Sequence, residues 1–303
     1  MKFTVLSSGS KGNALLVQSG ETTVMVEAGL GPRVLKERLE MAGLAGTRPS
    51  ALFVTHGHYD HCKHAAETAE AFNIPTLATP ECAMGRVHEG IPFFAHQPLS
   101  TRVPVKIGPL TIQAFATPHD APGSVGLVFD DGESRLGFAT DLGCVTSHIV
   151  AALRDCSLLY TEFNHDVDML KDGPYPASLK RRVLSNVGHL SNEQAAYLVA
   201  RARTPSLKTL VLAHLSEANN TPQLALAAAH RVVDGHGVTV HVAQQRSVLG
   251  PLVVARPPQR APVALPLVTV PVRAPVAVAA RARKPARYGT GPTAQLSLFG
   301  ALE

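Results

Sequence analysis

Four potential metal ligands follow directly on one apolar run, and no other feature of the sequence constrains the fold as strongly. The run is residues 51–54, and His56, His58, Asp60 and His61 come after it. If the loop begins extended, the first two histidines point the same way, and the last two, after a turn, can serve a second metal. Imidazole and carboxylate groups together suit Zn(II), Mn(II) or Fe(II) and do not suit Ca(II). The alternative is a polar loop with surface histidines, which this dense spacing disfavours.

Three later apolar runs also end in a side chain that can bind a metal. His119, Asp141 and His214 each come within a few residues of such a run. A sheet that collects its strand ends at one edge would bring these residues together. Each alone has another reading, as an ordinary loop histidine or an aspartate that caps a turn. Together with the first four residues they complete two coordination spheres.

The rest of residues 1–250 alternates β-rich runs with amphipathic stretches. The expected strands are 3–6, 14–18, 22–26, 51–54, 110–116, 125–129, 136–139, 158–162, 209–212 and 238–242. The expected helices are 32–42, 65–72, 177–187, 192–203 and 222–233. Residues 191–194 form a capping box, and Thr221 precedes a proline at the first helical position. Hairpins followed by βα alternation predict packed sheets with helices outside, an α/β class.

The composition limits the class of protein to which the chain can belong. The chain has 303 residues, of which 45% are hydrophobic and 17% charged, as in ordinary globular proteins. It contains no apolar run of about 18 residues and no secretory leader pattern, so we expect a cytoplasmic protein without a membrane span. The four cysteines lack CxxC spacing, which predicts reduced thiols instead of a disulfide framework or zinc knuckle.

The charge is unevenly distributed. From Arg256 onward there are seven basic residues and one acidic residue, a net charge of +6, which leaves −1 for the rest of a chain whose total is +5. We therefore predict a domain at 1–250 and a flexible Pro/Ala/Arg-rich tail at 251–303, in which an edge strand remains open. Such a tail is typical of an interaction segment that could touch nucleic acid.

Residues 55–61 resemble the THxHxDH signature of the metallo-β-lactamase superfamily, and the three later candidates follow in the superfamily's order. The resemblance implies an αββα sandwich, with two mixed sheets flanked by helices, that holds two divalent ions, Zn or Mn. It assigns the first metal to His56, His58 and His119, and the second to Asp60, His61 and His214, with Asp141 as the bridge.

Four further segments, 6–14, 161–166, 188–192 and 213–220, resemble the YycJ/WalJ family. Members of that family are regarded as 5′-to-3′ DNA exonucleases, and the resemblance spans roughly residues 1–245. Two residues depart from the family pattern. Glu27 stands where aspartate is usual and His64 where glycine is common, and neither is expected to touch a predicted ligand.

Chemical roles follow from these assignments. Two cations would share a hydroxide formed from a water molecule, and Asp60 would orient that water and accept its proton. His189, just before a capped helix, would donate a proton to the leaving 3′-oxygen, unless it merely packs at the helix start. Substrate phosphate is expected at a glycine-serine loop through Ser10, Lys11 and Asn13, although a plain hairpin explains that loop equally well. His165 would contact substrate, support a ligand, or serve only the fold.

A second motif stands near the C-terminus. Residues 295–299 resemble the QL(S/D)LF peptide by which bacterial repair and replication proteins bind the sliding clamp. The clamp-binding residues would be Gln295, Leu296, Ser297, Leu298 and Phe299. Leu298 and Phe299 would fill an apolar pocket, and tethering would concentrate the protein at clamp-loaded DNA.

The leading hypothesis is therefore a two-metal DNA exonuclease in DNA repair. A hydrolase of RNA, or of a small thioester, lactone or lactam, is the first alternative, because the same ligands would serve. A non-catalytic DNA- or clamp-binding adaptor is the second. Zn against Mn, exo- against endonuclease action, polarity and oligomeric state stay open at this point.

Overall fold

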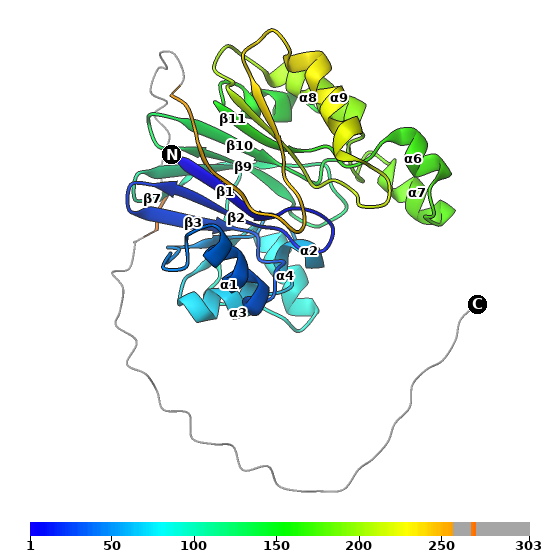
Figure 1. Cartoon of the computed structure of the whole chain (residues 1–303). Helices are drawn as coiled ribbons and strands as arrows, with labels where there is room; N and C mark the ends of the chain where they lie inside the picture. Colours follow the sequence, from blue (N-terminus) through cyan, green and yellow to red (C-terminus); the bar gives the residue numbers. More distant parts are fainter. Residues whose placement is uncertain (257–267, 271–303) are drawn as a thin grey trace, which may run out of the picture. The chain divides into compact units, whose positions relative to one another are not determined.

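Two mixed β-sheets pack face to face with helices on both outer faces, as predicted (Figure 1). The computed structural model describes residues 1–256 and 268–270. In hydrogen-bonding order, the first sheet consists of β14 (Leu249–Val253), β1 (Lys2–Ser7), β2 (Ala14–Ser19), β3 (Thr22–Val26), β4 (Leu52–Phe53), β5 (Thr76–Ala78) and β6 (Gln97–Pro98). The second consists of β13 (Thr239–Val242), β12 (Thr209–Ala213), β11 (Leu158–Glu162), β10 (Arg135–Ala139), β9 (Val125–Asp130), β8 (Leu110–Ala116), β7 (Val105–Ile107) and β15 (Val268–Thr269).

The helices fall into two groups. The N-terminal group is α1 (Pro32–Met41), α2 (Tyr59–Cys62), α3 (Ala65–Phe72) and α4 (Pro80–His88). The second group is α5 (Ser147–Leu153), α6 (Val167–Asp172), α7 (Ala177–Val183), α8 (Asn192–Ala202) and α9 (Pro222–Val233). The predicted starts of α8 and α9 are confirmed, because Ser191 forms a capping box with Gln194 and the Thr221 side chain accepts from the Leu224 amide.

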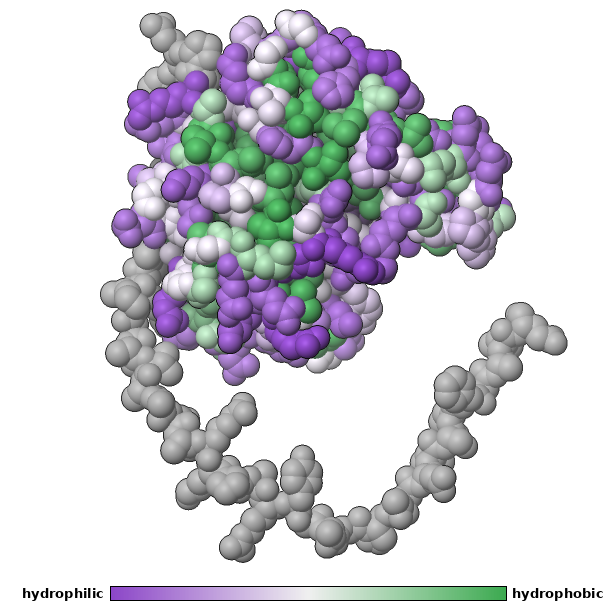
Figure 2. Space-filling view, viewed as in Figure 1, coloured by the Kyte–Doolittle hydropathy of each residue, from purple (hydrophilic) through white to green (hydrophobic). Residues whose placement is uncertain are grey.

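Three apolar layers hold the sandwich together. The central one lies between the sheets and includes Phe3, Phe53, Phe129 and Tyr160. A second layer packs α5, α8 and α9 against the second sheet, and a third packs α1, α3 and α4 against the first. Figure 2 shows hydrophobic residues gathered over the strands in mid-view, with hydrophilic residues over much of the helical surface. Among the described residues, none of the helices has the length and hydropathy to cross a membrane.

The sheets continue beyond the predicted domain boundary at 250. β14 spans that boundary and pairs antiparallel with β1, while β15 pairs with β7. The apolar and β-branched residues between the prolines explain why this segment can add edge strands. Residues 257–267 and 271–303, including the expected clamp-binding residues, lie outside the described residues.

Candidate metal centre

The seven predicted ligands converge because their strands end at the same edge. Asp60 and His61 lie on α2, which follows β4, and His119 follows β8. Asp141 comes two residues after β10, and His214 comes directly after β12. These two strands flank β11 in parallel pairing, so their carboxyl ends meet. The sandwich thus brings together residues that are up to 158 positions apart in sequence.

The potential ligand atoms form two principal groups. His56, His58 and His119 form one, and Asp60, His61 and His214 form the other; within each, all the atoms lie within 4.8 Å of one another. In the first group, His58 Nδ1 is 3.1 Å from His119 Nε2. In the second, Asp60 Oδ2 is 3.2 Å from His61 Nε2 and 3.1 Å from His214 Nε2. These are the two sets that the resemblance assigns to separate metals.

Asp141 connects the two groups. Its Oδ2 lies 3.4 Å from His61 Nε2, and its Oδ1 lies 3.9 Å from His119 Nε2. The residue has a φ of 60°, and His214 has one of 52°. A side-chain-bearing residue adopts this left-handed region at a cost, and such strain is concentrated at functional sites.

Several buried polar atoms at the centre have no hydrogen-bond partner among the described residues. They are His56 Nε2, His61 Nδ1, Asp141 Oδ2 and His214 Nδ1. All four residues are at most 3% exposed. Because an unsatisfied buried polar atom is costly, the unpartnered His56 Nε2 and Asp141 Oδ2 suit a bound cation, whereas His61 Nδ1 faces the Glu27 carboxylate at 3.4 Å. The buried His/Asp clusters therefore fit two metal ions.

The electrostatics agree with that fit. Burial lowers the pKa of His56, His58 and His119, which keeps these imidazoles neutral and able to ligate. Burial opposes ionisation of Asp141, yet the neighbouring histidines, His214 first, hold its pKa well below the usual value. Despite burial, Asp141 raises the pKa of His214 to about 8. Without metal, protonated histidines balance the carboxylates, a role that bound cations would take over.

Backbone carbonyl oxygens and one hydroxyl group orient two histidines of the first ligand group, His119 and His56. His119 Nδ1 lies 3.1 Å from the carbonyl oxygens of both Val187 and Gly188. A donated Nδ1–H leaves Nε2 as the ligating atom. His56 Nδ1 is 3.0 Å from the Thr55 hydroxyl, which directs its unpartnered Nε2 into the centre.

Glu27 contacts a predicted ligand, so the expectation that it would not is wrong. Its Oε1 lies 3.4 Å from His61 Nδ1 and accepts a 2.5 Å hydrogen bond from Thr55 Oγ1. The parallel pairing of β3 with β4 places residue 27 beside residue 55. Burial raises the pKa of the fully buried Glu27. A carboxylate behind a ligating imidazole fixes its ring and increases its basicity.

Glu162 is a second carboxylate that sequence reasoning missed. His189 Nδ1 lies 3.1 Å from Glu162 Oε2 and 3.6 Å from Asp141 Oδ1. Glu162 Oε1 accepts hydrogen bonds from the amides of Leu142, at 2.6 Å, and Leu190, at 3.2 Å. His189 therefore stands beside the candidate metals with its Nδ1 held by a fully buried carboxylate. The signals in the sequence were that Glu162 ends a predicted strand and lies in the 161–166 segment that resembles the YycJ/WalJ family.

The glycine-serine loop contacts the centre through Asn13, one of the three expected residues, and through Ser8, which was not expected. Asn13 Nδ2 lies 3.2 Å from His61 Nε2, whereas Lys11 Nζ pairs with Glu217 at 2.5 Å and Ser10 is exposed. The buried Ser8 hydroxyl accepts the His214 amide at 3.0 Å. Asn13 is thus placed at the metal centre, while Lys11 is engaged with a surface carboxylate.

His165 is too buried for the direct substrate contact considered above. It is 1% exposed, its carbonyl accepts the Asn192 amide at 2.8 Å, and neither ring nitrogen has a hydrogen-bond partner among the described residues. Burial, and then the charge of His189, lower its pKa to about 4. The geometry favours a supporting role at the start of α8.

The rim of the centre carries an unpredicted ion pair. Asp120 Oδ1 is 3.4 Å from His58 Nε2, and Arg182 binds the same carboxylate through Nε and Nη2. Arg182 is half-exposed, so this ion pair lies at the solvent-facing edge of the centre. Among the cysteines, Cys62 adjoins His61, but burial raises its pKa to about 12, and no described cysteine belongs to the ligand groups.

Sequence comparisons connect the chain with one family model and with curated relatives. Residues 22–215 fit the family model described as β-lactamase superfamily domain. The exodeoxyribonuclease YycJ of Bacillus anthracis is 34% identical over 242 residues, which cover 79% of this chain and 92% of the relative. The exodeoxyribonuclease WalJ of Streptococcus pneumoniae is 27% identical over 230 residues, covering 74% and 85%.

Solved structures share the fold at lower identity. The metallo-β-lactamase fold protein YhfI of Bacillus subtilis matches with a TM-score of 0.61 and 17% identity, over 82% of this chain and 99% of its own. Zn²⁺-bound PqqB of Methylobacterium extorquens matches with a TM-score of 0.61 and 16% identity, over 82% and 100%. At these identities the likeness concerns the fold alone.

Proposed function

The chain belongs to the metallo-β-lactamase superfamily and is a metal-dependent hydrolase, and on that premise we propose that it is a 5′-to-3′ DNA exonuclease. The observation that carries the proposal is the His189–Glu162 pair beside Asp141. A leaving 3′-oxygen needs a proton, and this pair offers a held imidazole next to the candidate metals. Two relatives named exodeoxyribonucleases support the choice of DNA.

Two divalent ions would be held by the two ligand groups described above, with Asp141 between them. When bound, they would supply Lewis acidity toward a phosphate and lower the pKa of water. Imidazole and carboxylate ligands accept both Zn and Mn.

The chain's own residues handle the protons and the substrate. Asp60, which is partly open to solvent, would orient the attacking water and accept its proton at a carboxylate oxygen. His189 would hold a proton at Nε2 for the departing 3′-oxygen while its Nδ1–H donates to Glu162. Arg182 is already paired with Asp120, and it would offer its remaining N–H donors to the phosphate at the rim.

Linear duplex DNA labelled at the 5′ or the 3′ end tests the activity with Mn(II), Zn(II) or EDTA. We expect early mononucleotide release from the 5′ label, and we expect its loss in EDTA and in the Asp60→Ala, His61→Ala double variant. A metal-loaded protein that leaves DNA intact would contradict the proposal. Turnover of RNA or of a small thioester by that same preparation would favour the alternative substrates.

We also propose recruitment to DNA repair by the sliding clamp through residues 295–299, on the basis of the QLSLF sequence. A clamp pulldown of the full chain is expected to lose the protein when these five residues are deleted. Leu298→Ala with Phe299→Ala should have the same effect, because both apolar anchors are removed. An unchanged pulldown would remove recruitment from the proposal and leave the nuclease intact.

A further inference from the structure

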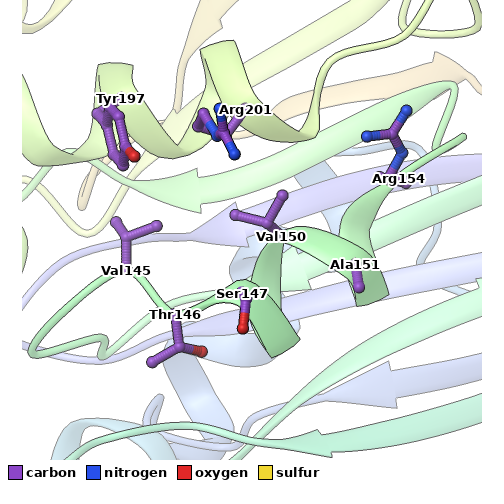
Figure 3. Close-up of a pocket in the computed structure, with 8 residues that line it drawn as sticks. All are labelled: Val145, Thr146, Ser147, Val150, Ala151, Arg154, Tyr197 and Arg201. Atoms are coloured by element: carbon purple, nitrogen blue, oxygen red, sulfur yellow. The ribbon is translucent and has the colours of Figure 1, made fainter.

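A groove between α5 and α8 has the chemistry of a nucleotide site but lies outside the metal centre. It has a volume of about 360 Å³ and is lined by Val145, Thr146, Ser147, Val150, Ala151, Arg154, Tyr197 and Arg201. Figure 3 shows Tyr197 and Arg201 extending from α8 toward Val150, with Arg154 at one end. On the proposed nuclease function, we propose that this groove binds one nucleotide of a single DNA strand that continues from the metal centre.

The charge of the groove fits a phosphate. Arg154 and Arg201 are both exposed, and the lining contains no acidic residue. Neither guanidinium forms an ion pair with a carboxylate in the part of the chain that the structure describes. By contrast, Arg182 and Arg231 each bind an acidic side chain. Two unpaired guanidinium groups on either side of a small cavity suit a phosphodiester.

The remaining lining suits a base and a sugar. Tyr197 is 56% exposed, although its side chain is large and aromatic. It lies four residues before Arg201, so both side chains extend from one face of α8. Val145 and Val150 provide an apolar floor. Stacking on an exposed aromatic ring accepts any base, and the cavity has room for a nucleotide but not for a duplex.

The groove is connected to the metal centre by short stretches of chain. Val145 lies four residues after Asp141, and α8 begins three residues after His189. Gly143 packs so closely on the loop before α8 that an added Cβ would lie 2.2 Å from the Asn186 carbonyl. Tyr197 is about 8 Å and Arg201 about 14 Å along the helix axis from Asn192. A strand that leaves the centre along α8 would reach the groove within a few nucleotides.

Binding of a fluorescein-labelled oligothymidylate to the metal-free full chain in EDTA tests the groove without turnover. We expect Tyr197→Ala to weaken binding about 5- to 150-fold and Tyr197→Phe to restore it, because the ring stacks. The Arg154→Gln, Arg201→Gln double variant should reduce the slope of log affinity against log salt by about 1.4. Arg48→Gln removes an equally exposed charge from the loop after α1 and should change the affinity little.

A second assay distinguishes a failure of the groove proposal from a failure of the proposed nuclease function. Hydrolysis of thymidine 5′-p-nitrophenyl phosphate by the metal-loaded protein should be the same in all groove variants, because this substrate reaches only the metal centre. Groove variants that bind the oligonucleotide like the wild type would overturn the strand site, and so would complete displacement of the oligonucleotide by free thymidine monophosphate. A wild type that binds the oligonucleotide but cleaves no phosphodiester would count against the nuclease alone.

Discussion

Replacing Asp141 by asparagine is expected to reduce metal-dependent hydrolysis on the order of 10³-fold or more and to lower the metal content of each chain. The carboxylate is fully buried and contacts both ligand groups, within 3.4 Å of His61 and 3.9 Å of His119. Asparagine preserves its shape but removes the negative charge that two cations would share. A loss of several kcal/mol of transition-state stabilisation corresponds to that decrease in rate.

Metal content by plasma mass spectrometry and initial rates on end-labelled DNA measure the two effects separately. Asp131→Asn is the matched control, because that carboxylate is 5% exposed and accepts the N-terminal ammonium at 3.2 Å, away from the ligand groups. The control should lose stability at most. An Asp141→Asn protein that keeps two metals and full activity would show that the residue is not the bridge.

The ligand set was predictable because each ligand follows an apolar run, and runs that form neighbouring parallel strands end at one edge. The 22–26, 110–116 and 158–162 strands have the predicted limits. α7 is an exception, since it ends at Val183 and not at 187. The chain turns back after α7, because the His189 amide donates to the Val183 carbonyl and a Cβ added at Gly188 would lie 2.2 Å from the Arg182 carbonyl oxygen.

What could not be predicted depends on contacts between distant segments. Glu27 supports His61 only because β3 and β4 pair in parallel, and Glu162 supports His189 only because β11 ends beside the loop before α8. In the sequence, each is an acidic residue at a strand end, which is equally typical of a solvent-facing turn. α4 was missed despite a usable signal, since Thr79 caps it and Pro80 begins it, as at α9.

Replacing His189 by alanine is expected to lower kcat on DNA by about 10² to 10⁴ without loss of metal, since a general acid contributes on that scale. The reason is geometric, because Glu162 Oε2 holds His189 Nδ1 at 3.1 Å and leaves Nε2 for the leaving group.

Glu162→Gln should retain its backbone hydrogen bonds to residues 142 and 190 through the amide oxygen. It loses the charge that orients the imidazole, so kcat should fall about 10- to 100-fold.

The leaving group distinguishes a proton donor from a structural or ligating histidine. p-Nitrophenolate departs without a proton, so His189→Ala should hydrolyse thymidine 5′-p-nitrophenyl phosphate nearly as fast as the wild type while failing on DNA. His88→Ala, an exposed histidine on α4, should leave both rates unchanged. Equal losses on the two substrates would assign His189 a structural role. Equal losses together with a missing metal ion would make it a ligand, since it also lies within 4.8 Å of candidate ligand atoms on Asp141, Glu162 and His214.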